Sequence, residues 1–141
     1  MRKILFMCVA NSARSQLAEG LARNSFGTGY EIQSAGSMPT KVNPYAITVM
    51  KEIGIDITNQ FSKTYDQLSP GFLTDLHYVI TLCAEEVCPV IVSRTAKKHH
   101  WPFPDPATKE KLSDEEMLKR FRNARDAIRI KLEAFKKEIE I

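Results

Sequence analysis

Two largely apolar runs, residues 3–9 and 77–82, constrain the fold of this chain more than any other feature. Each has the length of a strand, and continuous rather than alternating hydrophobicity is typical of strands buried on both faces. Such strands belong to parallel sheets, which need a crossover connection, usually a helix, between neighbouring strands. The two runs therefore predict a parallel sheet whose strands alternate with helices.

Segments with helical periodicity do alternate with these runs, and the first covers residues 15–26. A second begins at Asn43 and Pro44, an N-cap followed by proline at the first helical position, and stops at Gly54. The last begins where Ser113 and Glu116 match a capping box and extends to residue 139. Shorter strands are expected at 30–34, 60–63 and 98–102. We predict an α/β fold in which residues 1–141 form a single three-layer domain with a small open parallel sheet flanked by helices. The ligand site is expected beyond the carboxyl ends of the strands.

Composition restricts the class of protein further. The 141 residues are 43% apolar and 26% charged, the proportions of one globular domain rather than a disordered chain. The apolar runs are far shorter than the ~20 residues of a membrane span, and the first is better explained as a strand than as a signal peptide. A net charge of +3 favours a small anion over nucleic acid as the partner. We expect a cytoplasmic monomer that binds neither nucleic acid nor a membrane.

The first strand runs directly into CVANSARS at positions 8–15, and a helix follows. A strand–loop–helix turn points successive backbone N–H groups into one concavity at the positive end of the helix, where a tetrahedral oxyanion fits. The Arg14 guanidinium is placed to clamp two oxygens of that anion. The same donors favour the thiolate of Cys8, and the Ser15 hydroxyl is placed to donate to its sulfur. The alternative is that Cys8 is a core residue at a strand end and Arg14 a surface cation.

With this motif and a late Asp-Pro pair, the chain resembles the low-molecular-weight protein tyrosine phosphatase fold, and more closely its thioredoxin-coupled arsenate reductase branch. The last helix resembles the family mainly in its pattern. The resemblance implies reduction of arsenate to arsenite, with phosphate and sulfate as competing anions, thioredoxin as the electron donor, and no metal or other cofactor. The segments that carry it are CVANSARSQLAEG at 8–20, SAG at 34–36, VNPYAI at 42–47, MKEIGIDITNQ at 50–60, VITLCAEEVCP at 79–89 and HWPFPDPA at 100–107.

The resemblance also implies roles for individual residues. Cys8 would be the nucleophile, assisted by Ser15, and Arg14 would stabilise the transition state. Asp105 would be the general acid that protonates the leaving hydroxide, although without the family an Asp-Pro turn explains Asp105 equally well. The oxyanion would be held by the loop of Val9, Ala10, Asn11, Ser12, Ala13 and Arg14.

Two further cysteines, Cys83 and Cys88, decide between the two branches. Reduction of As(V) to As(III) takes two electrons, which two thiols supply when they form a disulfide. Cys83 follows the second buried strand, at the sheet edge where Cys8 also lies, so it can attack the Cys8–arsenic adduct and release arsenite. Cys88 would then attack the Cys8–Cys83 bond, which gives Cys83–Cys88 and frees Cys8. Positions five apart share no helix face, so we expect residues 83–88 to move.

Other functions stay open on the sequence alone. One is a small phosphatase that uses the same nucleophile, arginine and acid on aryl phosphates or phosphotyrosine. Ala107 disfavours tyrosine specificity, because these phosphatases tend to have an aromatic residue there that grips the substrate ring. Another is a non-catalytic redox sensor or anion-binding module, which needs no general acid. The later cysteines are alternatively inert, or zinc ligands with His99 and His100, although adjacent histidines are awkward ligands for one tetrahedral ion.

Two departures from the family pattern concern the loop and a cation site. Ala10 stands where the family usually has glycine, so alanine either restricts the loop or marks a φ that it tolerates. Some relatives bind potassium through an asparagine, a glutamate, a serine and an aspartate. Asn11, Glu19 and Ser34 match the first three, and Lys63 takes the place of the aspartate. An ammonium there would replace the metal and pair with Glu19, so we expect no potassium requirement.

Overall fold

The sheet of this protein is parallel throughout, as the two apolar runs predict. The structure is a computed structural model that describes residues 1–84 and 93–140. In this part of the chain the strand order is β2-β1-β3-β4, and every neighbouring pair is parallel. The runs themselves are the two central strands, β1 and β3. The strands are β1 (Arg2–Cys8), β2 (Tyr30–Gly36), β3 (Tyr78–Thr81) and β4 (Lys97–His100).

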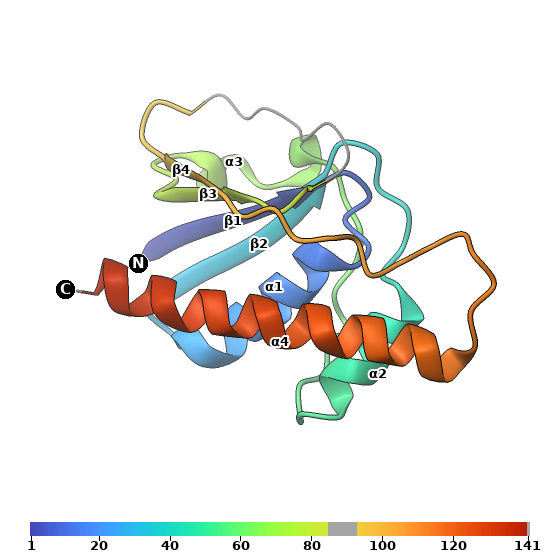
Figure 1. Cartoon of the computed structure of the whole chain (residues 1–141). Coiled ribbons are helices and arrows are strands. Elements are labelled where there is room, and N and C mark those ends of the chain that lie inside the picture. Colours follow the sequence, from blue (N-terminus) through green and yellow to red (C-terminus); the bar gives the residue numbers. More distant parts are fainter. Residues whose placement is uncertain (85–92, 141) are drawn as a thin grey trace.

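Helices cover both faces of this sheet. On one face lie α1 (Arg14–Phe26), α2 (Pro44–Lys51) and α4 (Asp114–Ile139), which pack against one another. Figure 1 shows these three helices gathered below the sheet, with α4 running along α1, and α3 above the sheet. The opposite face is covered by the short helices η1 (Tyr65–Gln67) and α3 (Pro70–Leu73). The expected three-layer arrangement is therefore present, with one thick and one thin helical layer.

The residues of β1 alternate between these two layers. Ile4 and Phe6 belong to the larger core under α1, α2 and α4, whereas Leu5 and Met7 belong to the smaller core under α3. All four side chains are at most 1% exposed. Burial of both faces explains why this strand is a continuous apolar run, and it fixes the position of the chemistry that follows Cys8.

The predicted helix boundaries rest on caps that the structure contains. Asn43 Oδ1 accepts a hydrogen bond of 2.9 Å from the Tyr45 amide, and Pro44 occupies the first position of α2. α2 ends at Lys51, three residues before the predicted stop at Gly54, and the φ of +80° at Gly54 closes the turn that follows at little steric cost. Ser113 Oγ accepts from the Glu116 amide at 3.1 Å and so begins α4. These local signals were readable in the sequence because each acts over a few residues.

Three expected strands need correction. Residues 60–63 form no strand, because their backbone groups serve other partners: the Lys63 amide donates to Asn11 Oδ1, and the Lys63 carbonyl accepts from the Gly36 amide. The strand expected at 98–102 is β4, which begins one residue earlier and ends at His100. The strand expected at 30–34 continues to Gly36, since β2 pairs with β1 along its whole length.

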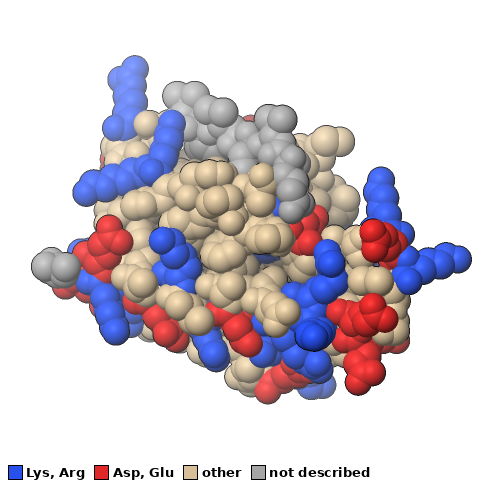
Figure 2. Space-filling view, viewed as in Figure 1, with Lys and Arg blue, Asp and Glu red and all other residues tan. Residues whose placement is uncertain are grey.

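The helices and the charged surface of the protein both bear on the expectation of no membrane span and no nucleic-acid partner. No helix of the described residues is long and apolar enough to cross a bilayer. On the face shown in Figure 2, lysine and arginine side chains are interspersed with aspartate and glutamate. This face therefore presents no continuous basic stripe.

Candidate active site

The candidate site forms where β1 ends and α1 begins. Cys8 is the last residue of β1 and is 2% exposed, and its Sγ lies 2.8 Å from Ser15 Oγ in the first turn of α1. Cys8 is a free thiol. The predicted pairing of these two side chains is confirmed, and it follows from the strand–loop–helix connection, because the loop folds the helix back over the strand end.

The loop at residues 9–13 is held from outside through its carbonyl groups. The carbonyls of Val9, Ala10 and Ser12 accept hydrogen bonds from the backbone amides of residues 38, 40 and 43, at 2.9 to 3.1 Å. In the described part of the chain, no acceptor is found for the amides of residues 10–13. Ala13 supplies no side-chain cap to α1, and the first turn of α1 has no acidic residue. The positive end of α1 is thus free to bind an anion.

Arg14 brings the loop together with the proline-rich segment at residues 101–107. Its guanidinium is buried and donates to the Phe103 carbonyl at 3.0 Å and to the Leu82 carbonyl at 3.5 Å. Arg14 Nη2 also lies 3.7 Å from Asp105 Oδ2. Asp105 Oδ1 accepts a hydrogen bond of 3.0 Å from the Ala107 amide. Asp105, 97 positions after Cys8 in the sequence, therefore lines the same site.

The resulting cavity has a volume of about 190 Å³ and is lined by the loop together with Thr40, Asp105 and Ala107. None of its described lining residues is aromatic. A tetrahedral oxyanion fits such a pocket, whereas none of these described residues would grip a phenyl ring.

Cys83 lies next to the site, just beyond the end of β3. Met7 pairs with Thr81, and the Leu82 amide continues the ladder by donating to the Met7 carbonyl at 3.0 Å. Strand spacing and rise then place the Cα atoms of Cys8 and Cys83 roughly 6 Å apart, within the range of a disulfide. Cys83 is 1% exposed and is disulfide-bonded in this structure, while Cys8 is free. Cys88, and most of the expected movement of residues 83–88, lie outside the described residues.

Asn11 is the structural centre of the loop, a role that its sequence position did not reveal. Its φ is +48°, so this residue, rather than Ala10, takes the left-handed conformation. The concern about alanine at position 10 is thereby answered, because Ala10 needs no positive φ. Asn11 Nδ2 donates to Ser15 Oγ at 2.7 Å and to Ser34 Oγ at 3.0 Å. Since Ser15 Oγ accepts from Asn11, its own proton is available to the Cys8 sulfur.

Three residues that the sequence did not single out also fix the loop. Gln16 Nε2 and Ser62 Oγ both donate to the Asn11 carbonyl, at 3.1 and 2.6 Å. Gly36 lies directly against the loop: a Cβ at this position would stand 2.4 Å from the Val9 carbonyl oxygen. The available signals were a polar glutamine within the buried stripe of α1 and, for Gly36, its place in the SAG segment, whereas nothing local distinguishes Ser62.

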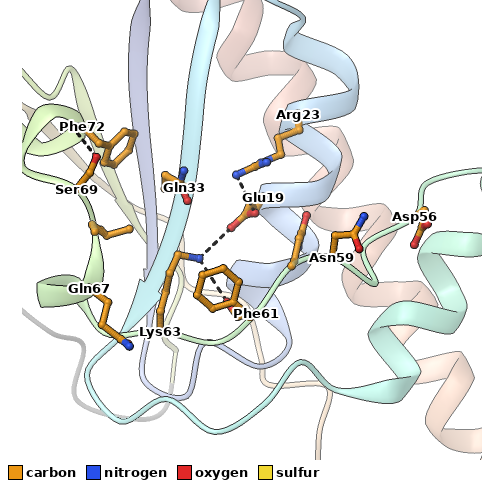
Figure 3. Close-up of a pocket in the computed structure, with 12 residues that line it drawn as sticks. Glu19, Arg23, Gln33, Asp56, Asn59, Phe61, Lys63, Gln67, Ser69 and Phe72 are labelled. Carbon is orange, nitrogen blue, oxygen red and sulfur yellow. Dashed lines mark hydrogen bonds and ion pairs between the residues drawn. The ribbon is translucent and has the colours of Figure 1, made fainter.

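The residues at the potassium positions of some relatives do come together, but around the ammonium group of Lys63, which Figure 3 shows beside Glu19. Ser34 Oγ donates to Glu19 Oε1 at 2.6 Å, and Lys63 Nζ lies 3.8 Å from the same oxygen. Glu19 Oε2 also faces Arg23 at 3.2 Å. Burial lowers the pKa of Lys63, an effect that the charge of Glu19 opposes. The ammonium of Lys63 thus lies beside Glu19, as expected, and the absence of a potassium requirement stays a prediction.

The zinc alternative of Cys83, Cys88, His99 and His100 is tested only in part, because Cys88 lies outside the described residues. His99 packs its ring against Phe135, and His100 Nδ1 lies 2.7 Å from Thr81 Oγ1. No group of three or more histidine, cysteine, aspartate or glutamate side chains in residues 1–84 and 93–140 is arranged to hold a metal ion.

Comparison with known proteins identifies the family. The model of the low molecular weight phosphotyrosine protein phosphatase family matches residues 3–140. The chain belongs to this family. Within it, the chain is 43% identical over 134 residues to an arsenate reductase of Halalkalibacterium halodurans, an alignment that covers 94% of this chain and 93% of the relative.

Solved structures of the phosphatase family agree with this placement. An arsenate reductase in its phosphate-binding state superposes with a TM-score of 0.77 at 33% identity and covers 99% of each chain. A thioredoxin-dependent arsenate reductase of Corynebacterium glutamicum superposes with a TM-score of 0.68 at 25% identity, over 98% of this chain and 63% of that protein. The expected fold and the expected branch of the family are both confirmed.

Proposed function

We propose that this protein reduces arsenate to arsenite through a cascade of three cysteines and is recycled by thioredoxin. One observation carries the proposal: a free Cys8 thiol at the base of an oxyanion-sized pocket, with Cys83 beyond the end of the neighbouring strand. Reduction needs two electrons, and two thiols within reach of one arsenic atom can supply them. The matched relatives named arsenate reductases, one of them thioredoxin-dependent, support the same reaction.

In the first step, the Cys8 thiolate attacks arsenic while Arg14 and the amides of the loop bind the remaining oxygens. Ser15 donates a hydrogen bond to the sulfur in the resting enzyme. Asp105 gives a proton to the departing hydroxide, which leaves as water. The product is a Cys8–arsenic adduct in which arsenic is still pentavalent.

In the second step, the Cys83 thiolate attacks the sulfur of Cys8. A Cys8–Cys83 disulfide forms, the sulfur–arsenic bond breaks, and its electron pair stays on arsenic, which leaves as arsenite. Cys88 then attacks Cys83 and frees Cys8, and a thioredoxin dithiol reduces the Cys83–Cys88 bond. A structure in which Cys83 is disulfide-bonded and Cys8 is free is compatible with the end of this sequence.

The pocket also supports a preference for inorganic oxyanions over phosphotyrosine. Thr40 and Ala107 line its mouth where an aromatic side chain would be needed to grip a ring. Weak hydrolysis of aryl phosphates is expected, because Cys8, Arg14 and Asp105 are the groups that this hydrolysis uses. Phosphate and sulfate should compete with arsenate for the loop.

The proposal includes the domain, the oligomeric state and the compartment in which the protein acts. Residues 1–141 act as one catalytic domain, and the protein works as a monomer in the cytoplasm. That compartment keeps thiols reduced and supplies a dithiol donor.

The deciding experiment is arsenate-dependent NADPH oxidation with thioredoxin and thioredoxin reductase at low phosphate. Cys8→Ser, Cys83→Ser and Cys88→Ser should each abolish turnover. Hydrolysis of 4-nitrophenyl phosphate is the internal control, because it should survive in the Cys83 and Cys88 variants and disappear only with Cys8. Phosphatase activity without arsenate turnover in the unmutated protein would instead assign it as a phosphatase.

A further inference from the structure

The segment that carries Asp105 has few backbone donors of its own. Residues 102, 104 and 106 are prolines, which have no N–H group. Only alternate residues can therefore donate backbone hydrogen bonds: the Phe103 amide bonds the Leu82 carbonyl at 3.2 Å, and the carbonyl groups of the segment need donors from elsewhere. Asp105 is itself 36% exposed, so packing alone does not hold its carboxyl group.

Those donors come from opposite sides of the segment. On the loop side, Arg14 donates to the Phe103 carbonyl at 3.0 Å. On the other side, Arg120 Nε donates to the Pro106 carbonyl at 2.8 Å, and Arg120 Nη2 donates to the Asp105 carbonyl at 3.2 Å. A guanidinium is a planar fork of N–H groups, and here its two arms bond two successive carbonyls.

The helix that carries Arg120 is a rigid support. Met117 and Phe121 lie on either side of Arg120 in α4, and both side chains are buried in the larger core. Arg120 itself is exposed, so it contributes little to that core. Its side chain thus connects the proline-rich segment to a part of the molecule that does not move easily.

Packing holds only part of this segment: Pro106 is buried and Phe103 packs against the larger core, whereas Pro104 is exposed. A cavity of about 260 Å³ lies between the segment and α4, lined by Phe103 and Pro104 together with Asn123, Ala124 and Ala127. Without the two hydrogen bonds of Arg120, the segment could shift toward this space, and the carboxyl group of Asp105 would shift with it.

We propose that Arg120 is a positioning residue for the general acid: it fixes the backbone of Asp105 so that the carboxyl group stays beside Arg14, in the cavity that Cys8 also lines. This inference rests on the role proposed above for Asp105. A shift of about 1 Å in a reacting group can cost on the order of 100-fold in rate. Because Arg14 and the Ala107 amide still hold the segment, we expect a loss of about tenfold when Arg120 is removed.

The test compares Arg120→Met with Arg129→Met, an exposed arginine of α4 that does not contact the segment. In thioredoxin-coupled arsenate turnover, Arg120→Met should lower kcat about tenfold with little change in KM, and Arg129→Met should stay within about twofold of the parent. Arg120→Lys should recover part of the loss, because an ammonium can bond one of the two carbonyls. Equal kcat values for the two methionine variants would overturn the inference.

A double-mutant cycle separates positioning from general structure. If Arg120 acts through Asp105, then Arg120→Met should cause no further loss of kcat in an Asp105→Asn background. Multiplicative losses would mean that Arg120 acts on something else, and the proposal would fail.

Hydrogen exchange tests the role of Arg120 without any measurement of activity, so its outcome does not depend on the proposed function. The Ala107 amide donates to Asp105 Oδ1, so its hydrogen exchange reports the order of the segment. Exchange at Ala107 should be faster in Arg120→Met than in Arg129→Met, whether or not arsenate is the substrate. Unchanged exchange would refute the inference, while absence of arsenate turnover in the parent would refute only the proposed function.

Discussion

The substitution Gly36→Ala tests whether the anion-binding loop must lie in direct contact with β2. Gly36 is the last residue of β2 and pairs with Cys8. An added Cβ would stand 2.4 Å from the Val9 carbonyl oxygen and 2.9 Å from the Asn11 amide nitrogen. Both atoms are backbone, so no side-chain rotation can relieve the contact. The φ of Gly36 lies outside the left-handed region, so the effect of the substitution is steric.

The size of the effect follows from this geometry. Since real Cβ contacts are essentially never below 3.0 Å, β2 and the loop must separate by at least roughly 0.6 Å. Overpacking of this kind costs about 1–3 kcal/mol of folding free energy. A displacement of that size at the oxyanion donors should lower arsenate turnover about 10- to 100-fold.

Two glycine variants serve as matched controls in the same turnover and thermal-melting assays. Gly71→Ala adds a Cβ that meets nothing within 4 Å, so both stability and turnover should stay near the parent values. Gly20→Ala adds a Cβ that lies 2.6 Å from Ile57 Cγ2 and 2.9 Å from Met50 Cε. It should lower the melting temperature but spare turnover at temperatures where the variant is folded, because these contacts lie in the core and not in the loop.

Gly36→Ala should therefore lower arsenate turnover by a larger factor than its loss of folding stability explains. Parent-like turnover in folded Gly36→Ala would refute the claim that the loop position depends on this contact. Equal losses of turnover in the Gly36 and Gly20 variants would show that instability alone explains the effect.

Three further predictions follow from other contacts. Ser15→Ala should lower arsenate turnover roughly 10- to 100-fold, because it removes the hydroxyl 2.8 Å from the Cys8 sulfur and such charge-assisted bonds are worth about 1.5–3 kcal/mol; a parent-like rate constant would contradict this. Exchanging sodium for potassium should change neither the melting temperature nor the affinity for arsenate, since Lys63 already faces Glu19. A markedly higher melting temperature or affinity in potassium than in sodium would disprove this prediction. Hydrogen bonds from Arg122 and, to a smaller extent, Arg125 hold the pKa of Glu52 below its ordinary value of 4.5. The stability that Glu52 contributes is therefore present above that pH and is lost as the pH falls through the lowered pKa. Denaturant titrations should therefore show a weaker loss of stability on acidification in Glu52→Gln, and an unchanged acid profile would refute it.

Much of the architecture was predictable because its signals are local. The apolar run of β1 lies within one strand, the caps at Asn43 and Ser113 act within one helical turn, and the stripe of α4 repeats every three or four residues along the helix. The segment at 60–63 was predicted wrongly for the complementary reason. Its backbone groups bond Asn11 and Gly36, residues far away in sequence, and such partners overrule a local preference for strand.

The reactive groups of the proposed chemistry could be recognised in the sequence: a cysteine and an arginine six positions apart between a buried strand and a helix, an aspartate in a proline-rich segment, and two later cysteines. The residues that hold these groups in place could be recognised only in the folded chain. Gly36 must lack a side chain, Gln16 and Ser62 bond the loop, and Arg120 bonds the segment of Asp105. The physical reason is that a reactive group is encoded by its own side chain, whereas its position depends on contacts between segments that only the folded chain brings together.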